Sequence, residues 1–321
     1  MVTCRILPRF LTKLLFVVFF LITYLSWTVA FGKDDPTVVF AVGDIADCTT
    51  LGGIRGKIRR WYDTFTGEYK GGGQEQTAKL LDSNTGIIIG LGDFAYPDGS
   101  SRNYKNCFDP AWGRHKSRIR PTPGNHDYWT PRASGYFEYF GASAGPSFRG
   151  YYSFDLAEWH IISLNGNFKH IDLDEQISWL RADLVKTEAR CILAFWHQPP
   201  FSSGRRGSAI ETRVLFNVLY EAGTTIILSG HEHNYERHAP QDPQGRIDLE
   251  RGIRVFVVGT GGGRVRTKDP GKQATNLEAL ISYQWGILKL VLHPTGYQWE
   301  FLPTDSASMR DKGSAGCVGR R

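Results

Sequence analysis

The chain of 321 residues contains no cluster of lysine and arginine residues interleaved with aromatic residues, although its formal net charge is +6. Nucleic acid is therefore not expected as a dedicated partner, because proteins that bind it usually carry such a patch. Arg5, Arg9 and Lys13 precede the first acidic residue, and without them the net charge is +3. A weakly basic surface of this kind suits anionic substrates.

No internal repeat and no low-complexity linker divides the sequence. The roughly 290 residues after the N-terminal segment are enough for one large α/β domain with a full core. We therefore expect one domain over residues 36–303, followed by a disordered polar tail over residues 304–321. A P-loop is also absent, because the glycine-rich residues 259–263 lack its lysine and spacing. These residues are expected to form a turn at a strand end.

The N-terminal segment differs in composition from the rest of the chain. Its three basic residues precede an almost uninterrupted apolar run over residues 14–29. This order is typical of a secretory signal peptide. The run is also close to the ~18–20 residues that span a bilayer, so residues 1–32 are expected to be a signal peptide or an uncleaved anchor formed by residues 14–31. In both cases the remaining chain is exported, because the positive charges precede the apolar run.

Apolar, β-branched runs alternate with amphipathic segments. Strands are expected at residues 38–42, 87–91, 151–156, 160–164, 191–196, 225–228, 255–258, 288–292 and 297–302, and helices at residues 74–81, 174–185 and 212–222. The early strand–helix–strand order predicts parallel pairing, and the later neighbouring strands predict antiparallel pairs. An α/β sandwich of two mixed sheets flanked by helices fits this order. Residues 49–73 are expected to be a long insertion.

Five short stretches carry polar residues, and several of them directly follow the predicted strands. They contain the sequences Gly-Asp, Gly-Asp-Phe-Ala-Tyr, Gly-Asn-His-Asp, Trp-His and Gly-His-Glu-His, and their candidate metal ligands are Asp44, Asp93, Tyr96, Asn125, His197, His231 and His233. In open α/β sheets, ligands bind beyond the carboxyl ends of the strands. Two cations a few ångströms apart need about seven oxygen or imidazole ligands, one of them a bridging carboxylate. Each motif is weak alone, but the complete set predicts a two-metal, phosphoester-cleaving site at the strand ends.

This set of motifs resembles the calcineurin-type metallophosphoesterases over residues 38–263. Tyr96, three residues after Asp93, narrows the resemblance to the purple acid phosphatase branch, and the layout resembles its small, single-domain members. The resemblance implies that Asp44, Asp93, Tyr96 and His233 hold ferric iron, which suits a phenolate ligand. Asp93 would bridge to a second metal, a divalent iron, zinc or manganese ion. The other ligands of this ion would be Asn125, His197 and His231.

The implied reaction is hydrolysis of a phosphomonoester by attack of metal-bound hydroxide. His126 adjoins Asn125 and is the candidate for protonating or stabilising the leaving group, with Asp127 as a neighbour that could orient it. Many relatives carry a further histidine after the one at the strand end, but residues 202–207 contain none. Arg205 or Arg206 could bind the substrate phosphate instead. These two arginines could equally well belong to a solvated basic loop that does not bind substrate.

Five cysteines are present, and Cys4 lies in the N-terminal segment. Export permits disulfides. Cys48 and Cys107 follow the first and second motifs, so we expect a disulfide between them above the same sheet edge. Cys191 begins an apolar strand and is expected to be a buried thiol, whereas Cys317 lies in the polar tail and is expected to be free.

Two rival functions stay open at this stage. The first is a phosphodiesterase of the same superfamily that uses manganese or zinc, which a comparison of monoester and diester turnover would distinguish. The second is an inactive binding or scaffold protein on the same fold. Missing ligands would favour the second rival, and all seven are present in the sequence.

Overall fold

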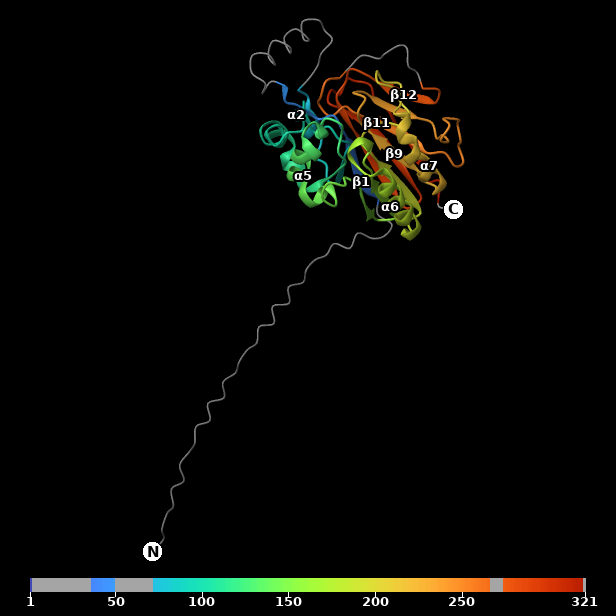
Figure 1. The fold of residues 1–321 in the computed structure, drawn as a ribbon, viewed down its shortest axis with the longest axis horizontal. Coiled ribbons are helices and arrows are strands. Elements are labelled where there is room, and N and C mark those ends of the chain that lie inside the picture. Colours follow the sequence, from blue (N-terminus) through green and yellow to red (C-terminus); the bar gives the residue numbers. More distant parts are fainter. Residues whose placement is uncertain (2–35, 50–71, 266–273, 320–321) are drawn as a thin grey trace. The chain divides into compact units, whose positions relative to one another are not determined.

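Two mixed β-sheets form the centre of the protein, and helices cover their outer faces (Figure 1). Besides Met1, the computed structural model describes residues 36–49, 72–265 and 274–319. The first sheet has the strand order β15-β14-β13-β1-β3-β5, with bounds Lys312–Gly316, Gly296–Pro303, Gly286–His293, Thr37–Val42, Ile87–Gly90 and Ile119–Pro121. The second has the order β12-β10-β11-β9-β8-β7-β6, with bounds Leu277–Ile281, Tyr235–His238, Arg254–Val258, Ile226–Ser229, Cys191–Phe195, Trp159–Ser163 and Tyr152–Leu156.

The strands that lead into the predicted motifs run in parallel within each sheet. β1 pairs with β3, and β3 pairs with β5, in parallel. β7, β8 and β9 are likewise parallel neighbours. Carboxyl ends of parallel strands meet at one edge of a sheet, so this arrangement brings the loops after them together. The later strands β13, β14 and β15 add antiparallel pairs, as expected for a mixed sheet.

Three apolar layers hold the sandwich together. The first lies between the two sheets and includes Val39, Leu193 and Phe301. The second lies between the first sheet and the helices α2 (Gln74–Lys79), α4 (Asp109–Trp112) and α5 (Ser134–Phe140), and the third lies between the second sheet and the helices α6 (Leu173–Lys186) and α7 (Arg213–Glu221). Short helical segments complete the chain: α3 (Ser101–Asn103), η2 (Tyr104–Phe108), η3 (Gly113–Arg118), η4 (Asp127–Trp129), η5 (Pro131–Ala133), η6 (Gly141–Ala144), η7 (Phe168–His170) and η8 (Ile210–Thr212).

Each predicted strand and helix lies within a few residues of an observed element of the same type. The period of the apolar residues explains this agreement. Leu180 and Leu184 are buried one helical turn apart in α6, and every residue of β8 is buried. After α7, Gly223 takes a left-handed conformation with φ 77°, which ends the helix without a steric penalty.

The C-terminal region corrects two expectations. Residues 304–321 were expected to be a disordered tail, but Lys312–Gly316 form β15 and pair with β14 over five residues. Cys191 and Cys317 were expected to be a buried thiol and a free cysteine, but they form a disulfide. Cys317 directly follows β15, and its amide donates to the carbonyl of Thr295 in the turn after β13, where Cys191 also lies near the carbonyl of Pro294. The strand pairing thus brings together two cysteines that are 126 residues apart.

The expected N-terminal signal or anchor segment lies outside the described residues, as does most of the predicted insertion at residues 49–73. Among the described residues, none belongs to a helix long and apolar enough to cross a membrane. A disulfide joins Cys48 and Cys107, the predicted pair, at a Cα–Cα distance of 5.6 Å. Two disulfides together suggest an oxidising, extracellular compartment.

Candidate active site

The first two motifs are held side by side by backbone hydrogen bonds. The amide of Asp44 donates to the carbonyl of Gly92 at 3.0 Å, and the amide of Ile45 donates to the carbonyl of Asp93 at 3.0 Å. Two short strands, β2 (Ala46–Asp47) and β4 (Ala95–Tyr96), then pair in parallel. The loops after β1 and β3 therefore form one continuous surface, and this surface carries three of the predicted ligands.

Three of the predicted ligands have a strained backbone. Asp44, Asp93 and His231 have φ values of 58°, 54° and 69°, in the left-handed region that side chains other than glycine rarely adopt. Such a conformation costs about 1–3 kcal/mol per residue and persists only where the surroundings impose it. Here it turns each side chain back over the end of its strand. Strain at three convergent polar residues indicates a functional site.

Glycine is required where these loops approach one another. A Cβ atom on Gly124 would lie 2.1 Å from Asp93 Oδ1, and one on Gly92, which has φ 86°, would lie 2.7 Å from His197 Nδ1. Any other residue at either position would displace a predicted ligand. The glycine that precedes each polar residue thus belongs to the packing of the site.

Tyr96, Asp44 and His233 form one half of the site. The hydroxyl of Tyr96 lies 2.6 Å from Asp44 Oδ1, and 3.0 Å from both Asp93 Oδ2 and His233 Nε2. His233 Nε2 is also 3.2 Å from Asp44 Oδ1. The other ring nitrogen of His233 bonds to the carbonyl of Arg264, which fixes the direction of the ring. Four donor groups therefore converge on one point.

His197 is the centre of the other half. Its Nε2 lies 3.2 Å from Asn125 Oδ1, 3.2 Å from His231 Nδ1 and 3.3 Å from Asp93 Oδ2. Its Nδ1 bonds to the carbonyl of Leu91 at 2.7 Å, so Nε2 is the nitrogen directed into the site. Asp93 contacts both halves through Oδ2. This is the position that the sequence analysis expects for a bridging carboxylate.

All seven predicted ligands thus lie in one cluster, and the carboxylates of Asp44 and Asp93 are 0% and 2% exposed. Burial opposes their ionisation, but the neighbouring imidazoles outweigh it and hold the pKa of both carboxyls below the usual range. Burial likewise opposes protonation of His197, yet the charge of Asp93 raises its pKa to about 9. Burial, with the nearby charges of His197 and Arg206, lowers the pKa of His231 to about 3.

The chemistry of this donor set fits metal ions. Asp44, Asp93 and His197 each offer one donor atom, and these three atoms lie within 4.8 Å of one another. All three residues are buried. Buried carboxylates are stable only when paired or bound to a cation. Here they share one cluster with a phenol and imidazoles, which are ordinary ligands of transition metals.

His126, the candidate proton donor, lies beside Tyr96 at the edge of the cluster. Its ring is 4.7 Å from the Tyr96 ring, and its Nδ1 lies 2.5 Å from the carbonyl oxygen of Pro97. Because a carbonyl only accepts, Nδ1 carries the hydrogen and Nε2 is left for proton transfer.

Asp127 does not orient His126, and that expectation is wrong. Its Oδ2 accepts from the backbone amides of Asp93 at 3.0 Å and Gly124 at 2.8 Å, and its Oδ1 accepts from Tyr104 at 2.8 Å. Burial and the charge of Asp93 raise the pKa of Asp127 to about 6. Asp127 therefore braces the backbone of two ligand loops. Adjacent residues in a tight turn point in different directions, and this explains why it misses the His126 ring.

The loop at residues 202–207 places one of the two candidate arginines beside the site. Arg205 and Arg206 are both exposed. The guanidinium of Arg206 donates to the carbonyl of His231 at 2.7 Å, and its backbone amide donates to Glu232 Oε1 at 2.5 Å. Glu232 itself is only 2% exposed. This contact between the two loops could not be read from the sequence, where a glutamate between two histidines is only a spacer.

A second anchor holds the start of the same loop. Glu236 and His238 are completely buried, and Glu236 accepts hydrogen bonds from Ser202 Oγ, the Ser203 amide and His238 Nε2 at 2.8–2.9 Å. Glu236 therefore holds the start of the arginine loop in place.

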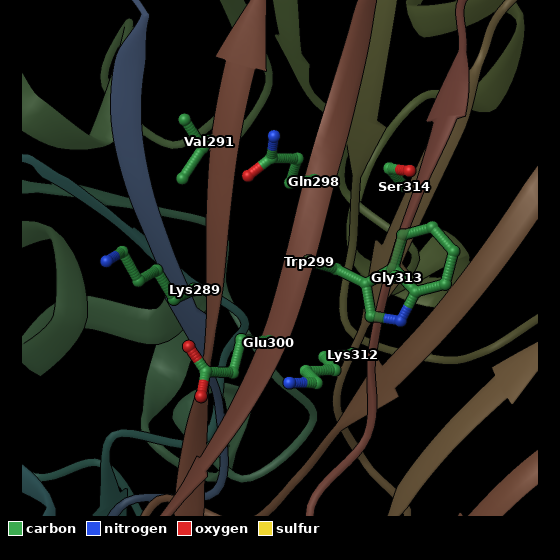
Figure 2. Close-up of a pocket in the computed structure, with 8 residues that line it drawn as sticks. All are labelled: Lys289, Val291, Gln298, Trp299, Glu300, Lys312, Gly313 and Ser314. Carbon is green, nitrogen blue, oxygen red and sulfur yellow. The ribbon is translucent and has the colours of Figure 1, made fainter.

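A separate surface pocket of about 420 Å³ lies on the outer face of β13, β14 and β15. Figure 2 shows Glu300 between Lys289 and Lys312, and each lysine is a cross-strand neighbour of Glu300. None of the seven predicted ligands lines it. The candidate metal ligands are therefore in the cluster at the strand ends and not in this pocket.

Comparison with known proteins agrees with this geometry. A family model described as Calcineurin-like phosphoesterase matches residues 24–235. The chain belongs to this family. Calcineurin-like phosphoesterases use a dinuclear metal centre, and in this chain the buried residues Asp44, Asp93 and His197 lie close enough together that they could hold a metal ion.

The curated relatives are distant purple acid phosphatases. The chain is 26% identical over 273 residues to purple acid phosphatase 15 of Arabidopsis thaliana, covering 70% of this chain and 48% of the relative. It is 27% identical over 243 residues to purple acid phosphatase 23 of the same plant, covering 60% and 51%. An acid phosphatase of Aspergillus ficuum is 25% identical over 170 residues, covering 46% and 28%. The chain thus spans about half or less of the length of these relatives.

Solved structures show the same fold. Purple acid phosphatase PPD1 from yellow lupin (Lupinus luteus) matches with a TM-score of 0.66 at 16% identity, covering 88% of this chain and 54% of that one. GAP50, described as the anchor in the inner membrane complex of Plasmodium, matches with a TM-score of 0.64 at 16% identity, covering 88% and 89%. The predicted fold class and the resemblance to purple acid phosphatases are both confirmed.

Proposed function

We propose that this protein is an exported phosphomonoesterase of the purple acid phosphatase type. The observation that carries the proposal is the position of Tyr96. Its hydroxyl lies within 3.0 Å of Asp44, Asp93 and His233, so a phenol would be part of the ligand set. A phenolate is a hard anionic ligand that suits a trivalent ion, which is the distinguishing requirement of this branch.

The two halves of the site would hold different ions. Asp44, Asp93, Tyr96 and His233 would hold Fe(III), since three of the four are oxygen ligands. The second ion would be a divalent iron, zinc or manganese ion. It would be held by Asp93 together with Asn125, His197 and His231. When bound, such a pair supplies an activated water and neutralises charge on the phosphoryl oxygens.

Residues at the rim would handle the substrate. His126 Nε2 would deliver a proton to the leaving oxygen of the ester, while Nδ1 stays bonded to the carbonyl of Pro97. The guanidinium of Arg206 is anchored beside His231 and would attract the phosphate dianion to the mouth of the site. Arg205 lies in the same loop and is the weaker candidate.

The test of monoester specificity compares an aryl monoester with the corresponding aryl diester. Turnover of the monoester at a kcat/KM at least tenfold above that of the diester is the expected result. The reverse order would favour the rival function, a phosphodiesterase that uses manganese or zinc. Elemental analysis of the same sample would report the metals.

The fold by itself does not separate an enzyme from a scaffold protein, because the GAP50 neighbour is described as an anchor. The described residues of this chain supply the complete predicted ligand set in one cluster, with Asp44 and Asp93 buried and ionised. Keeping two buried carboxylates is costly without a cation. This favours an active hydrolase over an idle binding protein.

A further inference from the structure

An exposed tryptophan lies beside the proposed proton donor. Trp129 is 63% exposed, whereas its neighbour Tyr128 is 8% exposed. Among the described residues, the other tryptophans are buried or half-buried. Trp129 ends the η4 turn, and its amide donates to the carbonyl of His126 at 3.2 Å. This backbone hydrogen bond holds Trp129 in the same turn as His126, and its indole ring lies mostly outside the core.

Three rings form a series from the buried site to solvent. The Tyr96 ring lies 4.7 Å from the His126 ring, and the His126 ring lies 4.3 Å from the Trp129 ring with an interplanar angle of 34°. Tyr96 is 9% exposed, His126 is half-buried and Trp129 is mostly exposed. The series therefore begins at a candidate metal ligand and ends at the surface.

We propose that Trp129 is the binding platform for the leaving group, and that the preferred substrates are phosphate monoesters of aromatic alcohols. This inference rests on the proposed function. In such an ester, the leaving oxygen joins the phosphorus directly to the ring. If His126 protonates that oxygen, the attached ring lies next to the His126 imidazole, where the indole is about one ring width away. Planar rings bind favourably to the face of an indole.

An alternative role for Trp129 is to support the His126 ring. That role predicts a loss of activity on every ester, and the largest loss on alkyl esters, because an alkoxide leaving group is more basic than a phenolate and needs the proton more. The platform role predicts a loss confined to substrates with a ring. A comparison of two leaving groups therefore separates the two roles.

The experiment uses the full chain and three variants, Trp129→Ala, Trp129→Leu and Trp129→Phe. Leu249→Ala serves as the matched control, since Leu249 is a 78% exposed apolar residue in another loop. Kinetic constants are measured for phenyl phosphate and glycerol 3-phosphate. Trp129→Ala and Trp129→Leu should lower kcat/KM for phenyl phosphate about 3- to 10-fold, mainly through KM, and change glycerol phosphate less than twofold. Trp129→Phe should retain most of the preference.

A binding measurement accompanies the kinetics. Phenylphosphonate and methylphosphonate carry the same charged group, and calorimetry compares their affinities. The wild type should prefer phenylphosphonate, and Trp129→Ala should abolish this preference. A loss on glycerol 3-phosphate as large as that on phenyl phosphate or larger, or equal affinity of the wild type for both phosphonates, would overturn the platform.

The two proposals fail in different ways. A wild type that hydrolyses neither ester contradicts the proposed function, but a phenyl preference in binding that depends on Trp129 would still support the platform. If the wild type hydrolyses both esters but the Trp129 variants have no selective effect, the proposed role of Trp129 is contradicted and the proposed function stands.

Discussion

The hydroxyl of Tyr96 donates a 2.6 Å hydrogen bond to Asp44 Oδ1, joining two residues that are 52 positions apart in the chain. Burial, together with the charges of Asp44 and Asp93, raises the pKa of Tyr96 well above 10. The chain alone therefore keeps this phenol protonated. A bound trivalent cation would replace the shared hydrogen and stabilise the phenolate.

Tyr96→Phe tests this relationship directly. The purified wild-type protein should show a broad visible absorption band from tyrosinate bound to ferric iron, and the variant should lose it. Removal of the metal from the wild type should also abolish the band, because the phenol then recovers its proton. A colourless wild type with full metal content would mean that Tyr96 is not an iron ligand, and would favour a manganese or zinc enzyme.

His126→Ala should lower kcat about 100-fold or more for phenyl phosphate, since general acid catalysis contributes about 10²–10⁴-fold. The loss should be smaller for 4-nitrophenyl phosphate, whose leaving group needs less protonation. Metal content, measured by elemental analysis, should be unchanged. The same loss on both esters would show that His126 is not the proton donor.

Arg206→Ala should raise KM roughly 10-fold, because a charge-assisted hydrogen bond to phosphate contributes about 1.5–3 kcal/mol. Arg205→Ala is the matched control in the same loop and should change KM less than threefold. Steady-state kinetics with inorganic phosphate as competing inhibitor would measure both effects. Equal effects of the two substitutions on KM would indicate that the positive charge of the loop attracts the substrate in general, without a specific contact from Arg206.

His160 predicts a pH-dependent part of the stability. Its Nδ1 lies 2.6 Å from Asp155 and its Nε2 lies 2.8 Å from Asp183. Burial opposes its protonation, but the two carboxylates outweigh burial and raise its pKa. The pKa of this histidine is higher in the folded than in the unfolded protein, where it is about 6.5. Protonated His160 therefore stabilises the fold at pH values below about 6.5, and this stabilisation is lost as the pH rises through the pKa of His160 in the folded protein.

Asp183→Asn should therefore destabilise the protein by about 1–2 kcal/mol at pH 5.5 and by less at pH 9. Denaturant unfolding at the two pH values measures the difference. Asp183 also accepts from Ser153 at 2.8 Å, so Ser153→Ala is the control for the part that does not depend on pH. A loss of the same size at both pH values would contradict the role of His160.

Cys317→Ser should lower the free energy of unfolding by roughly 2–5 kcal/mol, because the Cys191–Cys317 disulfide closes a loop of 126 residues. Reduction of the wild type should lower the melting temperature in the same direction. A non-reducing peptide map should show neither cysteine alkylated. Turnover should remain at low temperature, since the disulfide lies outside the ligand cluster. Alkylation of both cysteines in the native protein would rule out the bond.

Strand positions could be predicted closely because burial leaves a local signal. The run at residues 191–195 is apolar throughout, and every residue of β8 is buried. The strand at Ile119–Pro121 was not predicted, because three residues are too few for a period. The tail was misjudged for a related reason. Lys312–Gly316 is small and polar, and its strand exists only because β14 offers an open edge.

The sequence by itself determined which residues are candidate ligands, their order and their positions near strand ends, since these depend on local patterns and on the parallel crossover rule. Only the tertiary structure decided which groups touch. In the structure, Asp127 accepts hydrogen bonds from the backbone amides of Asp93 and Gly124. Arg206 donates to the carbonyl of His231, and the exposed Trp129 lies beside His126. Such contacts depend on backbone directions set by packing between distant segments, and a linear sequence contains no local signal for them.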